Sequence, residues 1–182
     1  MKLAALFGAV VVVAAATAAW VSNSAARTDT IRTYLATCAD SVYQAPAAQP
    51  PSTYAALRLG PVIFNHLAAR TRLDVSPPTD RERFYNVASF FNVFTSARRG
   101  VTIRLLGGDA SARLSAGRVR AAQAARAIRF LLCRDPGTKA PLITQYGISF
   151  LLRRPGCFTV EVQPVGTSKR FRATIPFRVS HC

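Results

Sequence analysis

The sequence predicts a mainly β fold, an antiparallel immunoglobulin-like sandwich preceded by an N-terminal apolar helix. Half of the 182 residues are hydrophobic, so the chain can bury a core of ordinary size. From Tyr54 onward, runs of β-branched and aromatic residues recur between glycine and proline turn signals. Towards the C-terminus apolar and polar residues alternate one by one, as in a strand with one buried face. We therefore expect one domain of about seven strands over residues 54–182.

Residues 1–26 carry the pattern of a secretory signal. Met1-Lys2 precedes an uncharged apolar run from Leu3 to Val21, and small residues follow as far as Ala26. A positive start, an apolar stretch and a small-x-small site are the three parts of a signal peptide. The apolar run is also long enough to cross a bilayer as an uncleaved anchor. Residues 1–26 are thus expected to be a signal peptide or a membrane anchor, and the protein is expected to be exported.

Residues 27–53 are expected to form an N-terminal segment and an extended arm. Ile31, Tyr34 and Leu35 fit one face of a short helix. The Pro/Ala-rich stretch 45–51 then suits an extended arm that leads into the sandwich.

The strands of the sandwich are read from alternation and turn signals. Gly60-Pro61 suggests a bend within an edge strand, and residues 164–168 suggest a hairpin loop. On the two strands that flank this loop, Glu161 and Arg172 fall on the polar face, opposite Val160 and Ala173. The expected strands cover residues 57–64, 84–94, 101–105, 127–132, 148–153, 158–163 and 171–179.

The segment 109–129 allows two interpretations. As a helix it would align Arg118, Ala122, Arg126 and Arg129 in a basic stripe suited to an anionic surface. Gly117 interrupts that pattern, and propensity alone is a weak guide, so we favour strand and loop.

Four cysteines in an exported chain predict two disulfides. Three pairings are possible, and spacing alone does not choose among them. The position of Cys182 at the last residue favours a bond to Cys38, which leaves Cys133 with Cys157. A zinc site is disfavoured, because there is no C-x-x-C pair and only His66 and His181 could assist.

The C-terminal half resembles a group of small, uncharacterised exported or membrane-anchored actinobacterial proteins with four cysteines. The resemblance rests on residues 57–64 after Cys38, on 128–133 ending in Cys133, on 146–150, on 155–162 around Cys157, and on 175–177 before Cys182. It implies export, disulfides and a β-sandwich, and it carries no catalytic activity.

The net positive charge predicts attraction to polyanions. Twenty-four basic residues face eight acidic ones, for a formal net charge of +16, and only three of the basic residues are lysines. Such a charge attracts anionic lipid, envelope polymer or nucleic acid, and export disfavours nucleic acid as the natural partner. The residues expected to contact anions are Arg118, Arg126, Arg129, Arg170 and Arg172.

Motifs for catalysis are missing from the sequence, so we assign no catalytic residue, metal ligand or cofactor. There is neither a P-loop nor a G-x-S-x-G elbow. Glu161 is expected in a surface ion pair rather than as a general acid. The aromatic run from Phe84 to Phe94 is expected in the core, with Tyr85 or Phe91 as the side chains that could turn outward to a ligand.

Two functions remain open at this point. The first is a non-catalytic envelope protein that binds a protein, a membrane surface or an anionic envelope polymer through arginines. The second is an exported hydrolase with an unidentified site. A cleft that joins His66 to carboxylates would favour the hydrolase, whereas a flat arginine patch on one sheet would favour binding.

Overall fold

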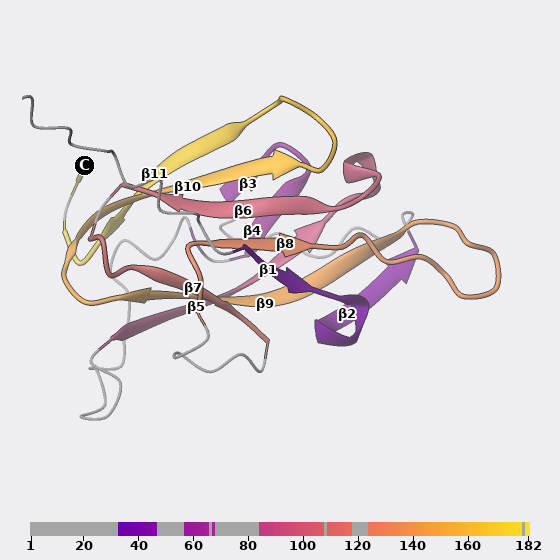
Figure 1. The fold of residues 1–182 in the computed structure, drawn as a ribbon, viewed down its shortest axis with the longest axis horizontal. Coiled ribbons are helices and arrows are strands. Elements are labelled where there is room, and N and C mark those ends of the chain that lie inside the picture. Colours follow the sequence, from indigo (N-terminus) through magenta and orange to yellow (C-terminus); the bar gives the residue numbers. More distant parts are fainter. Residues whose placement is uncertain are drawn as a thin grey trace, which may run out of the picture.

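The protein is a sandwich of two β-sheets, shown in Figure 1. The computed structural model describes residues 33–46, 57–65, 67, 84–107, 109–117, 124–179 and 181–182. Sheet A has the strand order β1 (Thr33–Ala36), β8 (Ala127–Phe130), β6 (Val101–Leu106), β10 (Gly156–Pro164) and β11 (Phe171–Phe177). Sheet B has the order β2 (Ser41–Pro46), β9 (Leu142–Leu152), β5 (Tyr85–Val93), β4 (Val62–Asn65) and β3 (Leu57–Leu59), and β7 (Arg113–Ala116) also pairs with β9.

The described residues confirm a mainly β two-sheet sandwich. Their helical segments are two short 3-10 turns, η1 (Cys38–Asp40) and η3 (Thr95–Ala97). In the same residues no helix has the length and apolar character needed to cross a membrane. The predicted signal or anchor, residues 1–26, lies outside the described part of the chain.

Aromatic rings from both sheets meet in the core. Phe91 of β5 and Phe130 of β8 are fully buried, and their ring centroids are 4.7 Å apart in an edge-to-face contact. Tyr146 of β9 lies beside both rings, at 5.8 Å from Phe91 and 5.0 Å from Phe130. Edge-to-face pairs of this kind add specific packing to the area they bury. The prediction that the aromatic run belongs to the core is therefore confirmed for Phe91.

The N-terminal segment departs from the expected helix and arm. Residues 33–36 form strand β1, which pairs in parallel with β8 from Thr33↔Ala127 to Ala36↔Phe130. The expected short helix through Tyr34 and Leu35 is therefore wrong; Ile31 lies outside the described residues. Strand pairing overrides the local helical spacing here because it buries Ala36 completely in the core. The parallel pair also means that the sheet is not wholly antiparallel.

A sharp turn then carries the chain from sheet A to sheet B. The Asp40 carboxylate accepts hydrogen bonds from the Thr37 backbone N–H (2.8 Å) and from Thr37 Oγ1 (3.0 Å). Strand β2 follows and pairs with β9. Ala45 and Pro46, expected at the start of the extended arm, belong to β2, whereas residues 47–51 lie outside the described part. Both sheets thus take a strand from the segment before residue 54.

Three further segments can be compared with expectation. The expected bent strand 57–64 is a hairpin, because β3 and β4 pair with each other across a turn at Gly60-Pro61. The expected hairpin between β10 and β11 is confirmed. Within the described parts of 109–129, β7 and β8 confirm strand and loop.

All four cysteines form disulfides, but in a different pairing from the one that the sequence favoured. The bonds are Cys38–Cys133 and Cys157–Cys182, with Cα atoms 5.7 and 5.8 Å apart. The strand arrangement explains the first bond. Because β1 and β8 are parallel neighbours, the chain leaves both strands at the same end, where Cys38 and Cys133 follow. The second bond joins the start of β10 to the segment after β11, its antiparallel neighbour.

Candidate functional site: an arginine face on sheet A

The outer face of sheet A carries an ion-pair row across three adjacent strands. The registers place Arg104 of β6 and Arg172 of β11 on either side of Glu161 of β10. Arg104 Nη1 donates to Glu161 Oε1 at 3.2 Å, and Arg172 Nε donates to Oε2 at 2.8 Å. Arg172 Nη2 also lies 2.7 Å from Oε2. The expected ion pair of Glu161 is therefore present, and it engages both carboxylate oxygens.

Glu161 stays ionised in this setting. Its side chain is only 2% exposed, and burial by itself opposes ionisation. The hydrogen bonds from Arg172 and Arg104, together with the charges of Arg172 and Arg170, outweigh burial and hold the pKa of Glu161 below its usual value. A carboxylate in this state accepts hydrogen bonds and does not supply a proton, which argues against a general-acid role.

A second row lies beside the first and ends in an exposed arginine. Arg129 of β8 pairs in register with Thr102 of β6, which pairs with Gln163 of β10. Gln163 Oε1 accepts a hydrogen bond from Arg104 Nη1 at 2.6 Å, so the two rows are connected. The row forms part of the lining of a hollow of about 150 Å³. No described residue accepts a hydrogen bond from the Arg129 side chain. We call Arg104, Arg129, Arg170 and Arg172 the arginine face.

The structure brings together some of the arginines expected to contact anions, but not all of them. Arg129 and Arg172 share the outer face of sheet A, and Arg170 is exposed immediately before β11. Arg126 is instead committed to the backbone, because its guanidinium donates to the carbonyl oxygens of residues 105, 107 and 110. Arg118 lies outside the described residues.

Two arginines near this face were not singled out from the sequence as anion contacts. Arg98 and Arg99 follow η3, are exposed, and line a larger hollow of about 410 Å³. The sequence signal was the pair of adjacent arginines before Gly100 and β6. The sequence places both arginines beside the aromatic run 84–94, and the fold sets residues 164–167 opposite them.

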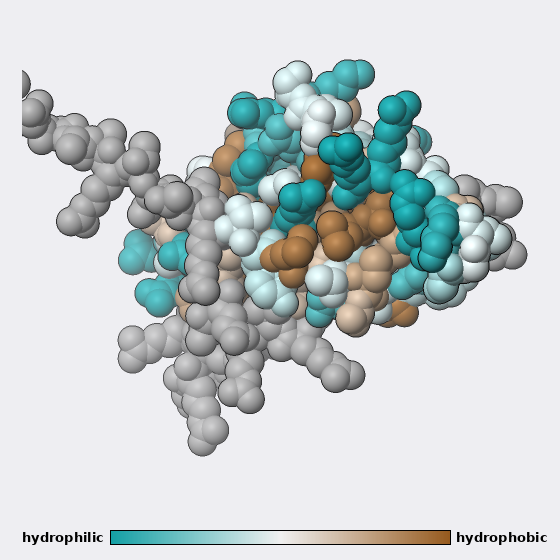
Figure 2. Space-filling view, turned by 45° about the vertical axis from the view of Figure 1, so that its right-hand side comes forward, coloured by the Kyte–Doolittle hydropathy of each residue, from teal (hydrophilic) through white to brown (hydrophobic). Residues whose placement is uncertain are grey.

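The outward aromatic side chain is also not the one expected. Phe91 is in the core, and Tyr85 packs edge-on against Phe177 with ring centroids 5.6 Å apart. Phe90 is the residue that turns outward, and its side chain is 49% exposed. The other large apolar side chains exposed among the described residues are Leu35, Val42 and Tyr43. Figure 2 shows, for one side of the molecule, hydrophilic side chains grouped around a smaller hydrophobic area.

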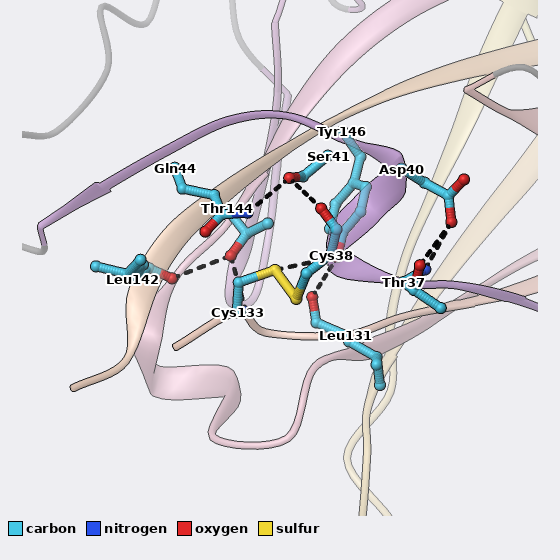
Figure 3. Close-up of a disulfide and its surroundings, with 10 residues drawn as sticks. All are labelled: Thr37, Cys38, Asp40, Ser41, Gln44, Leu131, Cys133, Leu142, Thr144 and Tyr146. Carbon is cyan, nitrogen blue, oxygen red and sulfur yellow. Dashed lines mark hydrogen bonds between the residues drawn. A yellow bond between two sulfur atoms is a disulfide. The ribbon is translucent and has the colours of Figure 1, made fainter. Parts of the chain in front are cut away.

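Around the Cys38–Cys133 disulfide, the polar groups are already satisfied by the fold (Figure 3). Tyr146 Oη donates to the Leu131 carbonyl oxygen at 2.7 Å, and the Cys133 backbone N–H donates to Thr144 Oγ1 at 3.0 Å. Burial, together with the negative charge of Asp40, raises the pKa of Tyr146 far above its usual value. The tyrosine therefore remains a neutral donor, which indicates a structural role for this cluster.

The described residues bring together no metal-binding cluster. No group of three histidine, cysteine, aspartate or glutamate side chains there could hold a metal ion. His66, whose convergence with carboxylates would favour the hydrolase, lies outside the described residues. His181 is exposed next to the disulfide-bonded Cys182.

Comparison with known proteins gives no relative from which to transfer a function. No family model, curated protein or solved structure matches this chain. The resemblance to exported actinobacterial proteins therefore stays a hypothesis. Two disulfides do indicate an oxidising, extracytoplasmic environment.

Proposed function

We propose that this protein is an exported, non-catalytic protein of the cell envelope whose arginine face binds an anionic envelope component. The observation that carries the proposal is the composition of the outer face of sheet A. Its arginines surround a single carboxylate among the described residues, and that carboxylate is fully engaged by Arg104 and Arg172. Glu161 therefore organises the arginines, while Arg129 and Arg170 leave positive charge available to a ligand.

Three further features support this proposal. The two disulfides suit a protein that folds outside the cytoplasm. The first 26 residues have the sequence pattern of a signal peptide or an anchor. The two-sheet sandwich is compatible with the immunoglobulin-like class that we propose for it, an architecture used by many cell-surface domains.

A sedimentation experiment with envelope material tests the binding function. Full-length oxidised protein is mixed with purified wall polymer and, separately, with anionic liposomes at low salt and at about 0.5 M salt. Exposed charges are strongly screened at the higher concentration, so we expect binding at low salt and release at high salt. Equal retention at both salt concentrations, or no retention at either, would contradict a function based on the arginine face.

Fractionation of the producing cells tests export. We expect the protein in the envelope or the medium, with no free thiols before reduction. Recovery in the cytoplasm with four reactive thiols would contradict the proposed location.

A further inference from the structure

The loop between β10 and β11 separates two hollows at the edge of the arginine face. The smaller hollow is lined by Thr102, Arg129 and Gln163, and the larger one by Ser96, Arg98, Arg99 and Thr167. Residues 164–166 line both hollows, so the two share one wall. We call the two hollows together the loop groove.

The shared wall is held in place from both sides. The Val165 backbone N–H donates to the Gly100 carbonyl oxygen at 3.0 Å, which ties the loop to the segment that carries Arg98 and Arg99. Gln163 Nε2 donates to the Thr167 carbonyl oxygen at 2.8 Å. Gly166 has a φ of +82°, and a Cβ added there would meet nothing within 4 Å. The wall therefore carries no side chain at Gly166, and the space that a side chain would take there is open.

The arginines of the loop groove have no acceptor among the described residues, whereas several other described arginines are committed to protein partners. Arg104 and Arg172 are paired with Glu161, and Arg113 and Arg126 donate to backbone carbonyl oxygens. By contrast, no described residue accepts a hydrogen bond from the side chains of Arg98, Arg99 or Arg129. A guanidinium group that lines a hollow without a protein partner is suited to a charged oxygen ligand, which it can bind with two parallel hydrogen bonds.

We infer that the loop groove binds one strand of a phosphodiester-linked polymer of the cell envelope. This inference rests on the proposed function and names the ligand class of the same basic surface. Arginines without a protein acceptor line the hollows on both sides of one wall, so successive negative groups of a single strand can occupy both hollows. Because the two groups belong to one strand, binding in the first hollow raises the effective concentration at the second, and the overall affinity increases.

The donors of the smaller hollow suit a phosphodiester. The smaller hollow combines a guanidinium with the hydroxyl group of Thr102 on the neighbouring strand. The two charged non-bridging oxygens of a phosphodiester can accept hydrogen bonds from both donors. Apart from Ala97, Pro164 and Val165, no apolar side chain of the described residues lines the hollows, which disfavours insertion into a membrane.

Calorimetric titration of the full-length oxidised protein with poly(glycerol phosphate) tests this inference. At about 50 mM salt, we expect Arg129→Gln and the double variant Arg98→Gln/Arg99→Gln each to weaken binding about tenfold, since each removes charge-assisted hydrogen bonds. The matched control is Arg58→Gln/Arg154→Gln, which removes the same charge as the double variant from exposed positions that line neither hollow. We expect the control to change the affinity less than about twofold. Far-UV circular dichroism verifies that all variants are folded.

Different outcomes separate this inference from the proposed function. If the groove variants and the control weaken polymer binding equally, the loop groove is not the binding site, while the proposed anion binding stands. Tighter binding of polygalacturonate or of anionic liposomes than of poly(glycerol phosphate) would overturn the ligand class. If inorganic phosphate binds as tightly as the polymer, the claim that one polymer strand occupies both hollows is overturned. If the wild-type protein binds none of these probes, the proposed function fails as well.

Discussion

Arg172 Nη2 lies 2.7 Å from Glu161 Oε2, on the outer face of a sheet in a strongly basic protein. Glu161 is 2% exposed and Arg172 is 54% exposed, so the pair joins a buried anion to a cation at the surface. Arg104 completes the arrangement on the other side of the carboxylate. Glu161 thereby holds the arginines of the two strands that flank β10 on the arginine face.

Replacing Glu161 should destabilise the fold. Glu161→Gln replaces the carboxylate shared by Arg104 and Arg172 with a neutral amide, and we expect a loss of about 1–3 kcal/mol in the free energy of unfolding. The partly exposed arginines can return to water, which keeps the cost below that of a fully buried pair. Urea unfolding measures the change. The double variant Glu161→Gln/Arg172→Gln should lose less free energy of unfolding than the two single variants lose in sum. Strict additivity of these losses would contradict an energetic coupling between Glu161 and Arg172.

The same carboxylate predicts an acid-dependent loss of stability. The pKa of Glu161 in the folded protein is below its usual value of 4.5, so its ionisation favours folding above about pH 4.5. That contribution is lost as the pH falls through the pKa of the folded state. The free energy of unfolding of the wild type should therefore decrease more steeply between about pH 5 and pH 2 than that of Glu161→Gln.

The other acidic groups do not obscure this comparison. Hydrogen bonds from Ser111 lower the pKa of Asp109, and hydrogen bonds from Thr138 lower that of Asp135. Both aspartates titrate alike in the wild type and in Glu161→Gln, so the difference between the two proteins isolates Glu161. Parallel pH profiles would contradict the assigned pKa direction.

The two disulfides should differ in their effect on stability. The Cys38–Cys133 bond spans a sequence separation of 95 residues, and the Cys157–Cys182 bond spans 25. On the loop-entropy estimate the longer closure contributes about 4.7 kcal/mol and the shorter about 3.5 kcal/mol. We expect Cys38→Ala/Cys133→Ala to lower the thermal midpoint more than Cys157→Ala/Cys182→Ala. Peptide mapping without reduction should recover these two pairs, and a Cys38–Cys182 peptide would contradict the fold of the N-terminal segment.

Gly100 should not tolerate a side chain. Its φ is +103°, and a Cβ there would overlap the Phe130 carbonyl oxygen and crowd the backbone of residues 131 and 132. Gly100→Ala should therefore destabilise the protein by more than the roughly 1 kcal/mol typical of a positive φ alone. Gly107→Ala is the matched control, because Gly107 has a φ of +67° and open space around the added Cβ. Equal thermal midpoints for the two variants would contradict the close approach of β8 to the start of β6.

Much of the sheet structure could be predicted because one-by-one alternation depends on local sequence. Strands β6 and β11 alternate between more and less buried residues as their sequence indicates, and Glu161 of β10 forms the expected ion pair although its side chain is buried. The N-terminal segment could not be predicted in the same way. The spacing of Tyr34 and Leu35 suits a helix, and only the long-range pairing with β8 makes them a strand.

The disulfide pairing and the loop groove have the same non-local origin. Cys38 meets Cys133 because β1 and β8 are parallel neighbours, which no spacing between cysteines could indicate. Arg98 and Arg99 meet the β10–β11 loop because the Val165 N–H bonds to the Gly100 carbonyl oxygen, across 65 positions of sequence. Properties carried by one strand were thus accessible from the sequence, whereas properties that need two distant segments were not.

The salt dependence of polymer binding tests the central claim most directly, namely that specific arginines on sheet A contact an anionic ligand. The slope of log affinity against log salt counts the phosphate contacts, and each lost contact should reduce its magnitude by about one. We predict a slope smaller by about two for Arg129→Gln/Arg170→Gln than for the wild type, and an unchanged slope for Arg58→Gln/Arg154→Gln. Identical slopes for all three proteins would contradict the account.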